Sequence, residues 1–413
     1  MTAVRLLMDK NIVVGVTGGI SAYKTVALCS RLVKAGALVD VIMTNAAAEF
    51  VRPITFQALT HRPVITEMFS MLQETEIGHV SLGKRADLMI IAPATANTLA
   101  KLAHGLADNM LTTTALACRA PILVAPAMET GMWNNPATQT NLQILRKRGL
   151  YVVGPVEGQL ASGSSGTGRM SEPDELFNVA RWIFSRRKPL GGARVVVSAG
   201  GTREAIDPVR FIGNYSSGKM GYALAQAASD RGADVVLIHG PTSLGKLYGV
   251  EDVAVESAER MHAAVLEAVS DADALIMAAA VADYRPAASA EHKIKKSAAG
   301  MPLNLVRTRD ILSAVAENRN ENGRLKAVIG FAAETESLVA NARDKLTRKR
   351  LDLIVANDVS TADSGFSVDT NRVTLIDSVG EANELPLLQK QEVAEIIIDR
   401  LMGLLKRSNY DRA

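Results

Sequence analysis

Two stretches of the sequence share one pattern, in which a continuous apolar run ends in a pair of glycines and a helix-like segment follows. The first is IVVGVTGG at 12–19 and the second is VVVSAGG at 195–201. Continuous apolar runs are typical of strands that are buried on both faces, as in a parallel sheet covered by helices. Further runs of this kind alternate with helical patterns in both halves of the chain. The sequence therefore predicts an α/β fold with two doubly wound, mainly parallel-sheet, Rossmann-like domains.

A chain of 413 residues is longer than a domain with a single hydrophobic core usually is, so we expect two domains. We expect a first domain at 1–184, a basic linker at 185–192 and a second domain at 193–413. The Gly/Ser-rich segment 158–168 has two interpretations, an interdomain linker or a mobile flap over a site. We favour the flap, because a further helical pattern at 174–184 follows this segment and closes the first domain.

The composition narrows the class of protein. The net charge of +3 is too small to predict nucleic acid as the main partner. No apolar run reaches the roughly 18–20 residues of a membrane span, and the first residues lack a signal-peptide pattern. The two cysteines, Cys29 and Cys118, lie in Ala/Leu-rich surroundings, which predicts reduced core thiols. These features predict a cytoplasmic protein with no membrane or nucleic-acid partner.

Small and polar residues follow three predicted strands of the first domain, where helices begin. Gly18–Ser21 follows the first strand, Thr44 the second, and 93–98 the next buried strand along the chain. Hydroxyl and amide donors at helix starts suit a phosphate or the edge of a flavin ring, although a glycine pair is also explained by a tight turn. Ser21 is the predicted N-cap of a helix at 22–34. For His79, a structural role is commoner than a catalytic one on spacing alone.

In the second domain, the segment GNYSSGKM at 213–220 satisfies the P-loop pattern G-x-x-x-x-G-K. Met220, however, stands where a Ser or Thr would bind magnesium, so we reject a Walker A motif and predict an anion-binding loop at a helix start. Asn214 is the side chain there that can both donate and accept hydrogen bonds. Asp283 follows a strand predicted at 274–281, either as a metal or ribose ligand or as a helix N-cap.

Two basic runs complete the set of candidate residues: KIKK at 293–296 and KLTRKR at 345–350. Such runs are often solvated surfaces, but two of them in a domain with phosphate-type loops also suggest a grip on a polyphosphate. Aromatic residues, which single-stranded nucleic acids stack on, make up only 4% of the chain and do not interleave with these runs. We therefore disfavour nucleic acid as their partner.

Taken together, the motifs resemble those of the bifunctional phosphopantothenoylcysteine decarboxylase/phosphopantothenate–cysteine ligase family of coenzyme A synthesis. The resemblance covers nearly the whole chain, in that family's domain order. The motifs of the first half are GGISAYK at 18–24, HVSL at 79–82, APATAN at 92–97, PAM at 126–128 and GTGRM at 166–170. Those of the second half are DPVRFIGNYSSGKMG at 207–221, AAVADY at 279–284, KIKK at 293–296, GFAAET at 330–335 and ANDV at 356–359.

For the first domain, the resemblance implies an FMN-dependent decarboxylase in which His79 and Ser162 occupy catalytic positions and Met128 and Glu129 contact the substrate. The implied FMN contacts are Gly18, Gly19, Ile20, Ser21, Thr44, Ala94, Thr95, Asn97 and Thr98. Two positions depart from the family pattern: Glu129 replaces an asparagine, and Ser162 replaces a flap cysteine that is often assigned as a proton donor. A hydroxyl is a much weaker acid than a thiol. The alternative is therefore a ligase whose decarboxylase domain has decayed to a flavin-binding scaffold.

For the second domain, the resemblance implies a ligase that activates 4'-phosphopantothenate with CTP and Mg²⁺ as an acyl-cytidylate, which cysteine then attacks. Lys293 and Asn214 would be catalytic, Asn214 and Ala280 would contact the substrate, and Asp283 would face the metal. The implied nucleotide contacts are Met277, Ala278, Ala279, Asp283, Lys293, Thr308, Arg309, Asp310, Ile311, Phe331, Lys345 and Lys349. The resemblance also implies a homo-oligomer with trimeric contacts between first domains and dimeric contacts between second domains, combined in a closed assembly such as a dodecamer.

Overall fold

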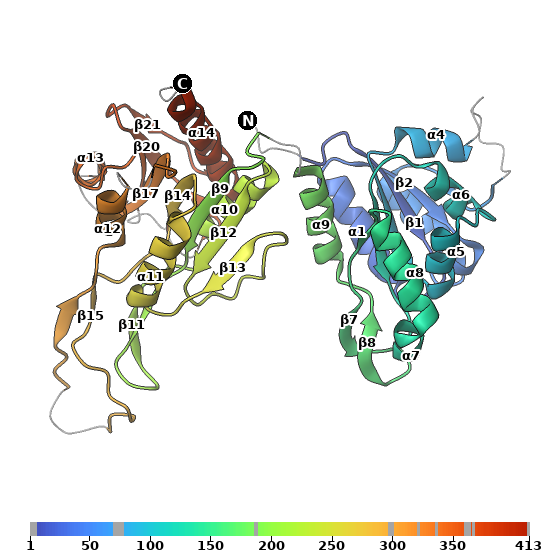
Figure 1. Cartoon of the computed structure of the whole chain (residues 1–413), viewed down its shortest axis with the longest axis horizontal. Coiled ribbons are helices and arrows are strands. Elements are labelled where there is room, and N and C mark those ends of the chain that lie inside the picture. The colour runs from blue at the N-terminus through green and yellow to red at the C-terminus, as the bar shows by residue number, and fades with distance from the viewer. Residues whose placement is uncertain are drawn as a thin grey trace. The chain divides into compact units, whose positions relative to one another are not determined.

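The computed structural model describes residues 6–68, 78–185, 189–295, 301–319, 323–334, 338–358, 365 and 368–410. The chain divides into two compact units, with the boundary between Phe184 and Ser185 (Figure 1). Each unit is described by itself. In the described part of the chain, every helix is too short or too polar to span a bilayer.

The N-terminal unit is built on a six-stranded sheet in which every pair of neighbouring strands is parallel, as the apolar runs predict. The order across the sheet is β3-β2-β1-β4-β5-β6, the doubly wound order. The strands are β1 (Asn11–Val16), β2 (Leu38–Met43), β3 (Val64–Ile65), β4 (Leu88–Ala94), β5 (Ile122–Pro126) and β6 (Tyr151–Val152).

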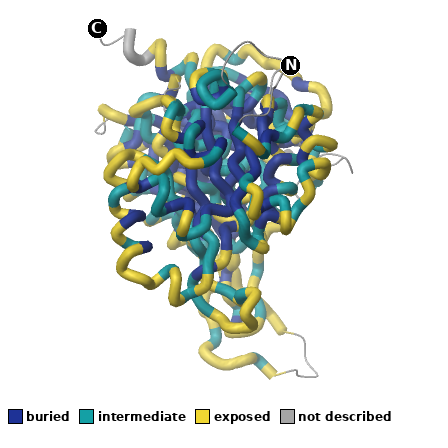
Figure 2. Tube along the Cα trace, turned by 90° about the vertical axis from the view of Figure 1, so that its right-hand side faces the viewer, coloured by how far each residue is buried: buried dark blue, intermediate teal, exposed yellow. Residues whose placement is uncertain are grey.

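Helices cover both faces of this sheet. The helices are α1 (Ala22–Lys34), α2 (Asn45–Ala48), α3 (Pro53–Thr60), α4 (Gly78–Arg85), α5 (Ala96–His104), α6 (Met110–Ala117), α7 (Thr130–Asn134), α8 (Pro136–Lys147) and α9 (Pro173–Ser185). Leu82 of α4, Leu99 of α5 and Leu142 of α8 pack into one core with strand residues such as Val13. The buried part of the chain accordingly follows the central strands, with exposed residues outside them (Figure 2).

The Gly/Ser-rich segment is a β-hairpin of this unit. Its antiparallel strands are β7 (Val156–Gln159) and β8 (Ser165–Arg169), and α9 follows directly. The interdomain-linker interpretation of 158–168 is therefore wrong, because the segment lies well before the boundary between the units. Movement of the hairpin over a site stays a prediction.

The C-terminal unit repeats the order of the first sheet. Its eight-stranded sheet runs β13-β12-β9-β14-β17-β18-β20-β21, parallel through β18 and antiparallel at the β20–β21 edge. The strands of this sheet are β9 (Arg194–Ala199), β12 (Asp234–His239), β13 (Glu251–Ala254), β14 (Ala274–Met277), β17 (Ala327–Glu334), β18 (Leu353–Asp358), β20 (Val373–Asp377) and β21 (Ala382–Glu384). The helices are α10 (Lys219–Asp230), α11 (Ala258–Val269), α12 (Ile311–Asn318), α13 (Leu338–Arg348) and α14 (Lys390–Tyr410).

Alternating side chains of β9 explain why the central residues of the strand, 195–197, are all apolar. Val195 and Val197 enter a core with α10 and α14, whereas Val196 enters a second core with α11, α12 and α13. Both faces of the strand are buried, so the polar alternation of a half-exposed strand is absent. Burial of such a valine contributes about 1.5–3 kcal/mol relative to exposure.

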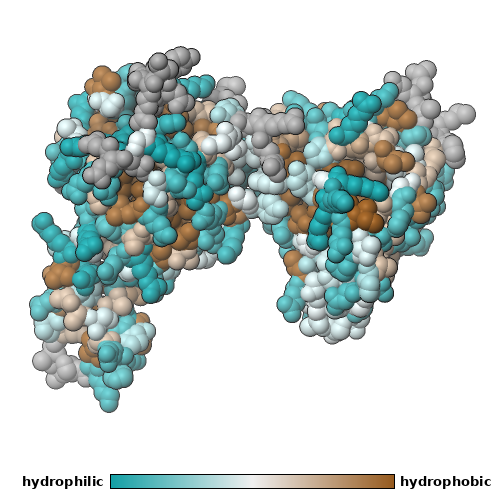
Figure 3. All heavy atoms as spheres, viewed as in Figure 1, coloured by the Kyte–Doolittle hydropathy of each residue, from teal (hydrophilic) through white to brown (hydrophobic). Residues whose placement is uncertain are grey.

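Short antiparallel pairs extend from the C-terminal unit. They are β10 (Arg203–Ala205) with β11 (Phe211–Gly213), β15 (Tyr284–Pro286) with β16 (Leu305–Arg307), and β19 (Thr370–Asn371) with β22 (Leu388–Gln389). The first two pairs lie in the part of the unit that projects downward in Figure 1. Apolar and polar residues are mixed on this projection (Figure 3), and its exposed apolar side chains include Val209, Phe211, Tyr284, Leu303, Leu305 and Val306.

The structure corrects one strand. The run predicted at 274–281 is a strand only as far as Met277, and the chain then leaves the sheet. Asp283 consequently precedes β15 rather than a helix, so the helix N-cap interpretation of this residue is wrong.

Candidate active sites at the switch points of the two sheets

In both sheets, the chain order reverses at one pair of neighbouring strands, β1 with β4 and β9 with β14. In open α/β sheets, ligands bind beyond the carboxyl ends of the strands at such a switch point. Gly18–Ser21, the Ala94–Thr98 loop and Asp283 were predicted at the carboxyl ends of strands.

In the N-terminal unit, hydrogen bonds join the loops that leave β1 and β4. The Thr17 hydroxyl donates to the carbonyl of Pro93 at 2.7 Å, and the N–H of Thr95 donates to the Thr17 oxygen at 3.2 Å. Gly18 and Gly19 follow Thr17 directly, so the glycine turn and the Ala94–Thr98 loop, which were predicted separately, lie side by side.

The glycine pair has a structural explanation at one of its two positions. A Cβ on Gly18 would lie 2.5 Å from the Cβ of Ala46, so the approach of α2 requires glycine there. A Cβ on Gly19 would meet only Pro93, at 3.7 Å, which is ordinary contact. The pair is therefore not in itself a sign of phosphate binding.

Three helices begin near this turn, and their first side chains differ in whether they already accept a helix-capping hydrogen bond. Thr44 accepts from Ala47 at the start of α2, and Thr95 accepts from Thr98 at the start of α5. Ser21 is the N-cap of α1, as predicted, but its side chain makes no capping hydrogen bond within the described residues. The Ser21 hydroxyl at the start of α1 is thus suited to bind an anion, whereas the N–H groups of Ala22 and Lys24 already donate to the carbonyls of Gly19 and Ser21.

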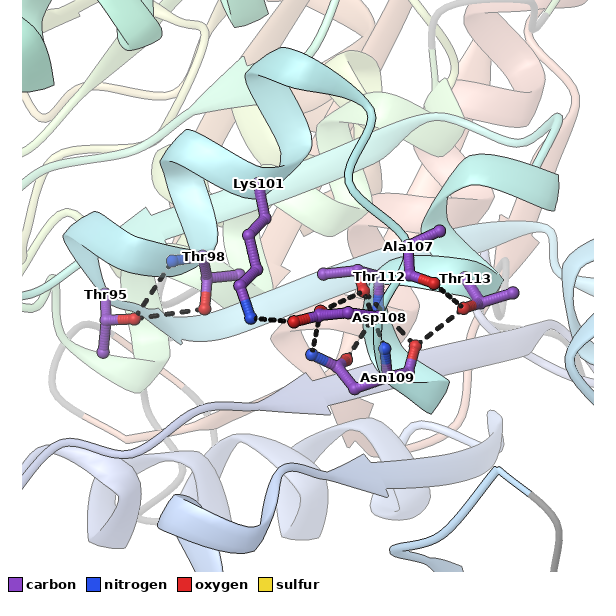
Figure 4. A network of polar contacts seen from close by, with 8 residues as sticks. All are labelled: Thr95, Thr98, Lys101, Ala107, Asp108, Asn109, Thr112 and Thr113. Atoms are coloured by element: carbon purple, nitrogen blue, oxygen red, sulfur yellow. Dashed lines mark hydrogen bonds and ion pairs between the residues drawn. The ribbon is translucent and has the colours of Figure 1, made fainter.

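A polar network holds the α5–α6 connection beside Thr95 and Thr98 (Figure 4). Lys101 pairs with Asp108 at 2.5 Å, and this bond is the main reason that the pKa of Asp108 lies below its usual value. Asn109 forms a capping box with Thr112 at the start of α6. The polar groups of the connection that follows α5 are therefore paired with one another.

His79 lies in the first turn of α4. Its Nδ1 is buried and has no hydrogen-bond partner within the described residues. Buried polar atoms are rarely left unpaired, so a free imidazole nitrogen fits a group that meets a substrate better than a structural histidine. The helix itself is anchored, since Arg85 at its end pairs with the buried Asp40 at 3.0 Å.

The hairpin and the residues after β5 lie together. The N–H of Met128 donates to the carbonyl of Gly168 at 3.0 Å. A Cβ on Gly168 would lie only 2.1 Å from the backbone oxygen of Met128, so this close approach requires glycine. Ser162, at the hairpin turn, is exposed and bonds the Ser164 hydroxyl at 2.8 Å. Glu129 caps α7, its Oε2 accepting from the N–H of Gly131 at 2.5 Å. Glu129 thus already has a local structural role that the sequence pattern did not indicate.

The C-terminal unit contains a cleft of about 1040 Å³ at its switch point. Loops from four strand ends and the start of α10 surround it. Its lining includes Asn214, Met277, Ala278, Ala279, Ala280, Asp283, Thr308, Arg309, Asp310, Ile311, Phe331, Lys345 and Lys349, which are predicted site residues. The structure therefore brings together nearly all of the residues predicted for this half.

Hydrogen bonds between loops shape the wall of the cleft. Asn214 donates from Nδ2 to the Ala280 carbonyl at 2.9 Å, and Gly201 pairs with Ala280 as an isolated parallel bridge. The Ser198 hydroxyl accepts from Ala279 at 3.1 Å. Residues 278–280 therefore leave the sheet because Ala279 bonds to the side chain of Ser198 in β9 instead of to its backbone, and the N–H of Ala280 bonds to the Gly200 carbonyl just after β9.

Cations gather on another side of the cleft. Lys345 donates to the Phe331 carbonyl at 2.8 Å, and the largely buried Lys349 donates to the Asp310 carboxylate and, at 2.6 Å, to the Ser313 hydroxyl. Burial would raise the pKa of Asp310, but bonds from Lys349 and from Ser313 outweigh it and lower that pKa. Asp310 also caps α12, which fixes the position of Lys349 relative to that helix.

Two lysines that were not predicted as site residues also line the cleft. Lys219 opens α10 and pairs with Asp369 at 2.7 Å. Lys390 is buried and donates to the carbonyls of Gly365 and Val368, at 2.8 and 2.6 Å. Burial, followed by repulsion from Lys219, lowers the pKa of Lys390 to about 8. Lys390 lies among ordinary surface-type residues in the sequence, and only the fold reveals that it is buried beside the cleft.

Lys293 stands apart from the other predicted residues. The described residues that line the cleft do not include Lys293 or Lys295, and Lys296 lies outside the described residues. Among the described residues, no group of three or more His, Cys, Asp or Glu side chains could hold a metal ion. Asp283 therefore offers a single carboxylate, which fits a Mg²⁺ bound mainly by a triphosphate rather than by the protein.

The sequence matches two family models, Flavoprotein over residues 3–183 and DNA/pantothenate metabolism flavoprotein C-terminal domain over residues 190–404. The Coenzyme A biosynthesis bifunctional protein CoaBC of Bacillus subtilis (strain 168) is 47% identical over 406 residues, which are 98% of this chain and 99% of that protein. Its counterpart in Vibrio cholerae is 46% identical over 397 residues, 95% of this chain and 98% of that protein.

Two solved structures each cover about half of the chain. The crystal structure of the C-terminal domain of a Coenzyme A biosynthesis bifunctional protein CoaBC is 42% identical, with a TM-score of 0.46, over 53% of this chain and 99% of that one. The FMN-dependent cysteine decarboxylase SpaF is 32% identical, with a TM-score of 0.38, over 42% of this chain and 96% of that one.

The identity over nearly the full length of both chains, and the two domain models in the same order, decide the family. The chain belongs to the CoaBC family of coenzyme A biosynthesis, and it is a bifunctional enzyme with a flavoprotein decarboxylase domain and a C-terminal ligase domain.

Proposed function

We propose that the C-terminal unit joins cysteine to 4'-phosphopantothenate with CTP, and that the N-terminal unit decarboxylates the product to 4'-phosphopantetheine with FMN. The observation that carries the ligase assignment is the cleft at the β9–β14 switch point. It combines a polar loop at the start of α10 with Arg309, Lys345 and Lys349, a donor set suited to a nucleoside triphosphate.

The ligase reaction has two steps. A carboxylate oxygen of 4'-phosphopantothenate bonds to the α-phosphorus of CTP while the bond to the β-phosphate breaks, which releases pyrophosphate. The amine of cysteine then bonds to the acyl carbon, CMP leaves, and the nitrogen gives up a proton. Charge builds up on the phosphate oxygens in the first step, so fixed cations are the main catalytic requirement.

The described contacts support separate roles for the groups of the cleft. Lys345 and Lys349 would bind the triphosphate, and Asp283 would meet Mg²⁺ carried by it. Asn214, held by its bond to Ala280, would contact the acyl group. Two further parts of the proposal rest on the family and not on these contacts: the action of Lys293, which is not among the described residues that line the cleft, on the α-phosphate, and the preference for CTP.

In the N-terminal unit, the residues at the β1–β4 switch point fit FMN. The open hydroxyl of Ser21 and the start of α1 would hold the phosphate, and the Ala94–Thr98 loop would contact the ring. The chemistry that FMN supplies when bound is a reversible two-electron oxidation of the substrate's cysteine. The unpaired Nδ1 of His79 would contact the substrate carboxylate or move a proton beside it.

Exposed apolar side chains support an assembly of several copies. Ile20 and Tyr23 beside the glycine turn are 61% and 60% exposed, and Phe50 and Ile54 lie beyond α2. In the C-terminal unit, the projecting strands carry a second apolar group that includes Phe211 and Tyr284. Apolar groups of this kind are typical of protein interfaces, and they would supply the trimeric and dimeric contacts of a homo-oligomer.

Release of pyrophosphate from CTP by the purified full chain tests the ligase assignment. We expect release only when 4'-phosphopantothenate is present, and product formation only when cysteine is added. No release, or release that does not depend on 4'-phosphopantothenate, would refute it. Release of carbon dioxide from phosphopantothenoylcysteine, after reconstitution with FMN, decides between an active decarboxylase and a flavin-binding scaffold.

A further inference from the structure

A buried carboxylate holds the segment that carries Lys293. Asp207 lies in the turn between β10 and β11, and its side chain has no exposed surface. Its Oδ2 accepts from the backbone N–H of Ile294, 87 residues further along the chain, at 3.1 Å. Ile294 stands between Lys293 and Lys295, so the carboxylate bonds to the basic segment itself. We call Asp207, Arg210 and Ile294 the Asp207 clamp.

The clamp holds Ile294 at both of its backbone polar groups. Arg210 donates from Nε and Nη2 to Asp207 at 3.0 and 2.5 Å, and its Nη2 also donates to the Ile294 carbonyl at 2.8 Å. A further bond, from the N–H of Ala290 to the Ile206 carbonyl at 3.0 Å, ties the same two segments. Since both the N–H and the carbonyl of Ile294 are bonded, the direction of the backbone next to Lys293 is fixed.

The turn does not by itself require this arrangement. Asp207 also accepts at 2.9 Å from the N–H groups of Val209 and Arg210, a local bond pattern that a serine or an asparagine commonly provides. The bonds to Arg210 and Ile294 use the second carboxylate oxygen. The Arg210 guanidinium is the main reason that the pKa of Asp207 lies far below its usual value, so the clamp is charged at neutral pH.

We propose that Asp207 is a positioning residue of the ligase reaction: by fixing the backbone of Ile294, it fixes the point from which the side chain of Lys293 extends. This inference rests on the proposed function, in which Lys293 acts on the α-phosphate of CTP. Asp207 itself does not line the cleft in the described part of the chain. It therefore acts on the reaction through the segment that it holds.

The test compares two substitutions in the full chain. Asp207→Asn puts an amide where the carboxylate now accepts three bonds at Oδ2, two from Arg210 and one from Ile294, and two backbone bonds at Oδ1. Asp207→Ser keeps an acceptor for Val209 and Arg210 but cannot reach Ile294, so it separates the turn from the clamp. A misplacement of about 1 Å at a reacting group costs up to about 100-fold in rate. We expect kcat for pyrophosphate release to fall about 10- to 100-fold in both variants.

Binding of CTP is the second readout, because the cations of the cleft are untouched. We expect the dissociation constant of CTP, measured by calorimetry, to stay within about twofold of the wild-type value. Hydrogen exchange should show faster exchange at the Ile294 amide in both variants. The matched control is Asp234→Asn, which removes an exposed carboxylate that pairs with Arg194 at the other end of the sheet, and it should leave all three readouts unchanged.

The outcomes separate the inference from the proposed function. If the wild-type chain does not release pyrophosphate with 4'-phosphopantothenate, the proposed function fails before any variant is compared. If the wild type is active but Lys293→Ala is equally active, the inference falls with its premise. If the Asp207 variants keep their kcat, or lose CTP binding and kcat together, Asp207 does not position Lys293. If neither variant folds, rapid exchange of the Ile294 amide in the wild type would overturn the clamp, and slow exchange would support it.

Discussion

Lys349→Met tests how the cleft binds a triphosphate. Lys349 is 9% exposed at its side chain, and its ammonium bonds to Asp310 and Ser313. Methionine retains most of the length and apolar contact of the stem but removes the charge. The variant therefore separates the electrostatic part of the lysine's role from its packing.

The expected magnitudes differ for stability and binding. Asp310 is 52% exposed, so solvent screens the ion pair and its loss should cost about 1 kcal/mol of unfolding free energy. A charge-assisted hydrogen bond to phosphate contributes about 1.5–3 kcal/mol, which corresponds to roughly a 10- to 100-fold weaker CTP complex. Affinity should therefore fall much more than stability.

Calorimetric titration of CTP and urea unfolding of the full chain measure the two quantities. The matched control is Arg343→Met on α13, because Arg343 is exposed, bonds the Gly380 carbonyl at 2.9 Å and is not among the described residues that line the cleft. The reasoning is refuted if Lys349→Met binds CTP within about twofold of the wild type. It is equally refuted if the variant loses about 3 kcal/mol of stability, since the lysine would then be structural.

Three further predictions concern burial and proton transfer. Arg231 is 3% exposed between Glu395 and Asp399, so Arg231→Met should lower the unfolding free energy by about 3–5 kcal/mol in urea titrations, and adding Glu395→Leu should recover most of it. Ser162→Cys should increase carbon dioxide release from phosphopantothenoylcysteine, because a thiol is the stronger acid; an unchanged rate would show that the hairpin side chain donates no proton. The pKa of Lys390 is lowered to about 8, below its unfolded value, so the folded state loses this proton first. Stability of the wild type relative to Lys390→Met should rise between about pH 8 and 10.5, and a flat difference in thermal unfolding would contradict the assignment.

The central strands were predictable because they are buried on both faces. Their apolar runs, such as 12–17 and 195–197, are short, rich in β-branched residues and followed by glycines, which favours a strand over a buried helix. The observed strands differ from these runs by one or two residues at most ends. The strand predicted at 274–281 was too long because alanine is apolar and small, and therefore carries no signal of where a strand leaves the sheet. Backbone N–H groups after Met277 donate to the Gly200 carbonyl and to the Ser198 and Thr202 hydroxyls, which are remote in the sequence, and these bonds end the strand.

The residues that line the cleft could be predicted from the sequence motifs. The contacts that hold residues of the site in place could not. Nearly all predicted residues of the C-terminal unit surround one cleft, because the carboxyl ends of its parallel strands meet at one edge. The burial of Lys390, the helix-capping role of Glu129 and the bond between Asp207 and Ile294 depend on contacts between segments that are remote in the sequence. Such contacts leave no periodic or compositional signal.

The two units have separate hydrophobic cores. The core formed with α4, α5 and α8 contains only residues of the N-terminal unit, and the two cores formed with α10–α14 contain only residues of the C-terminal unit. A substitution that abolishes one activity should therefore leave the other half folded. In genetic terms, two alleles that are each defective in a different half, such as Lys349→Met and His79→Ala, should complement one another when both are expressed in a cell that lacks the wild-type gene.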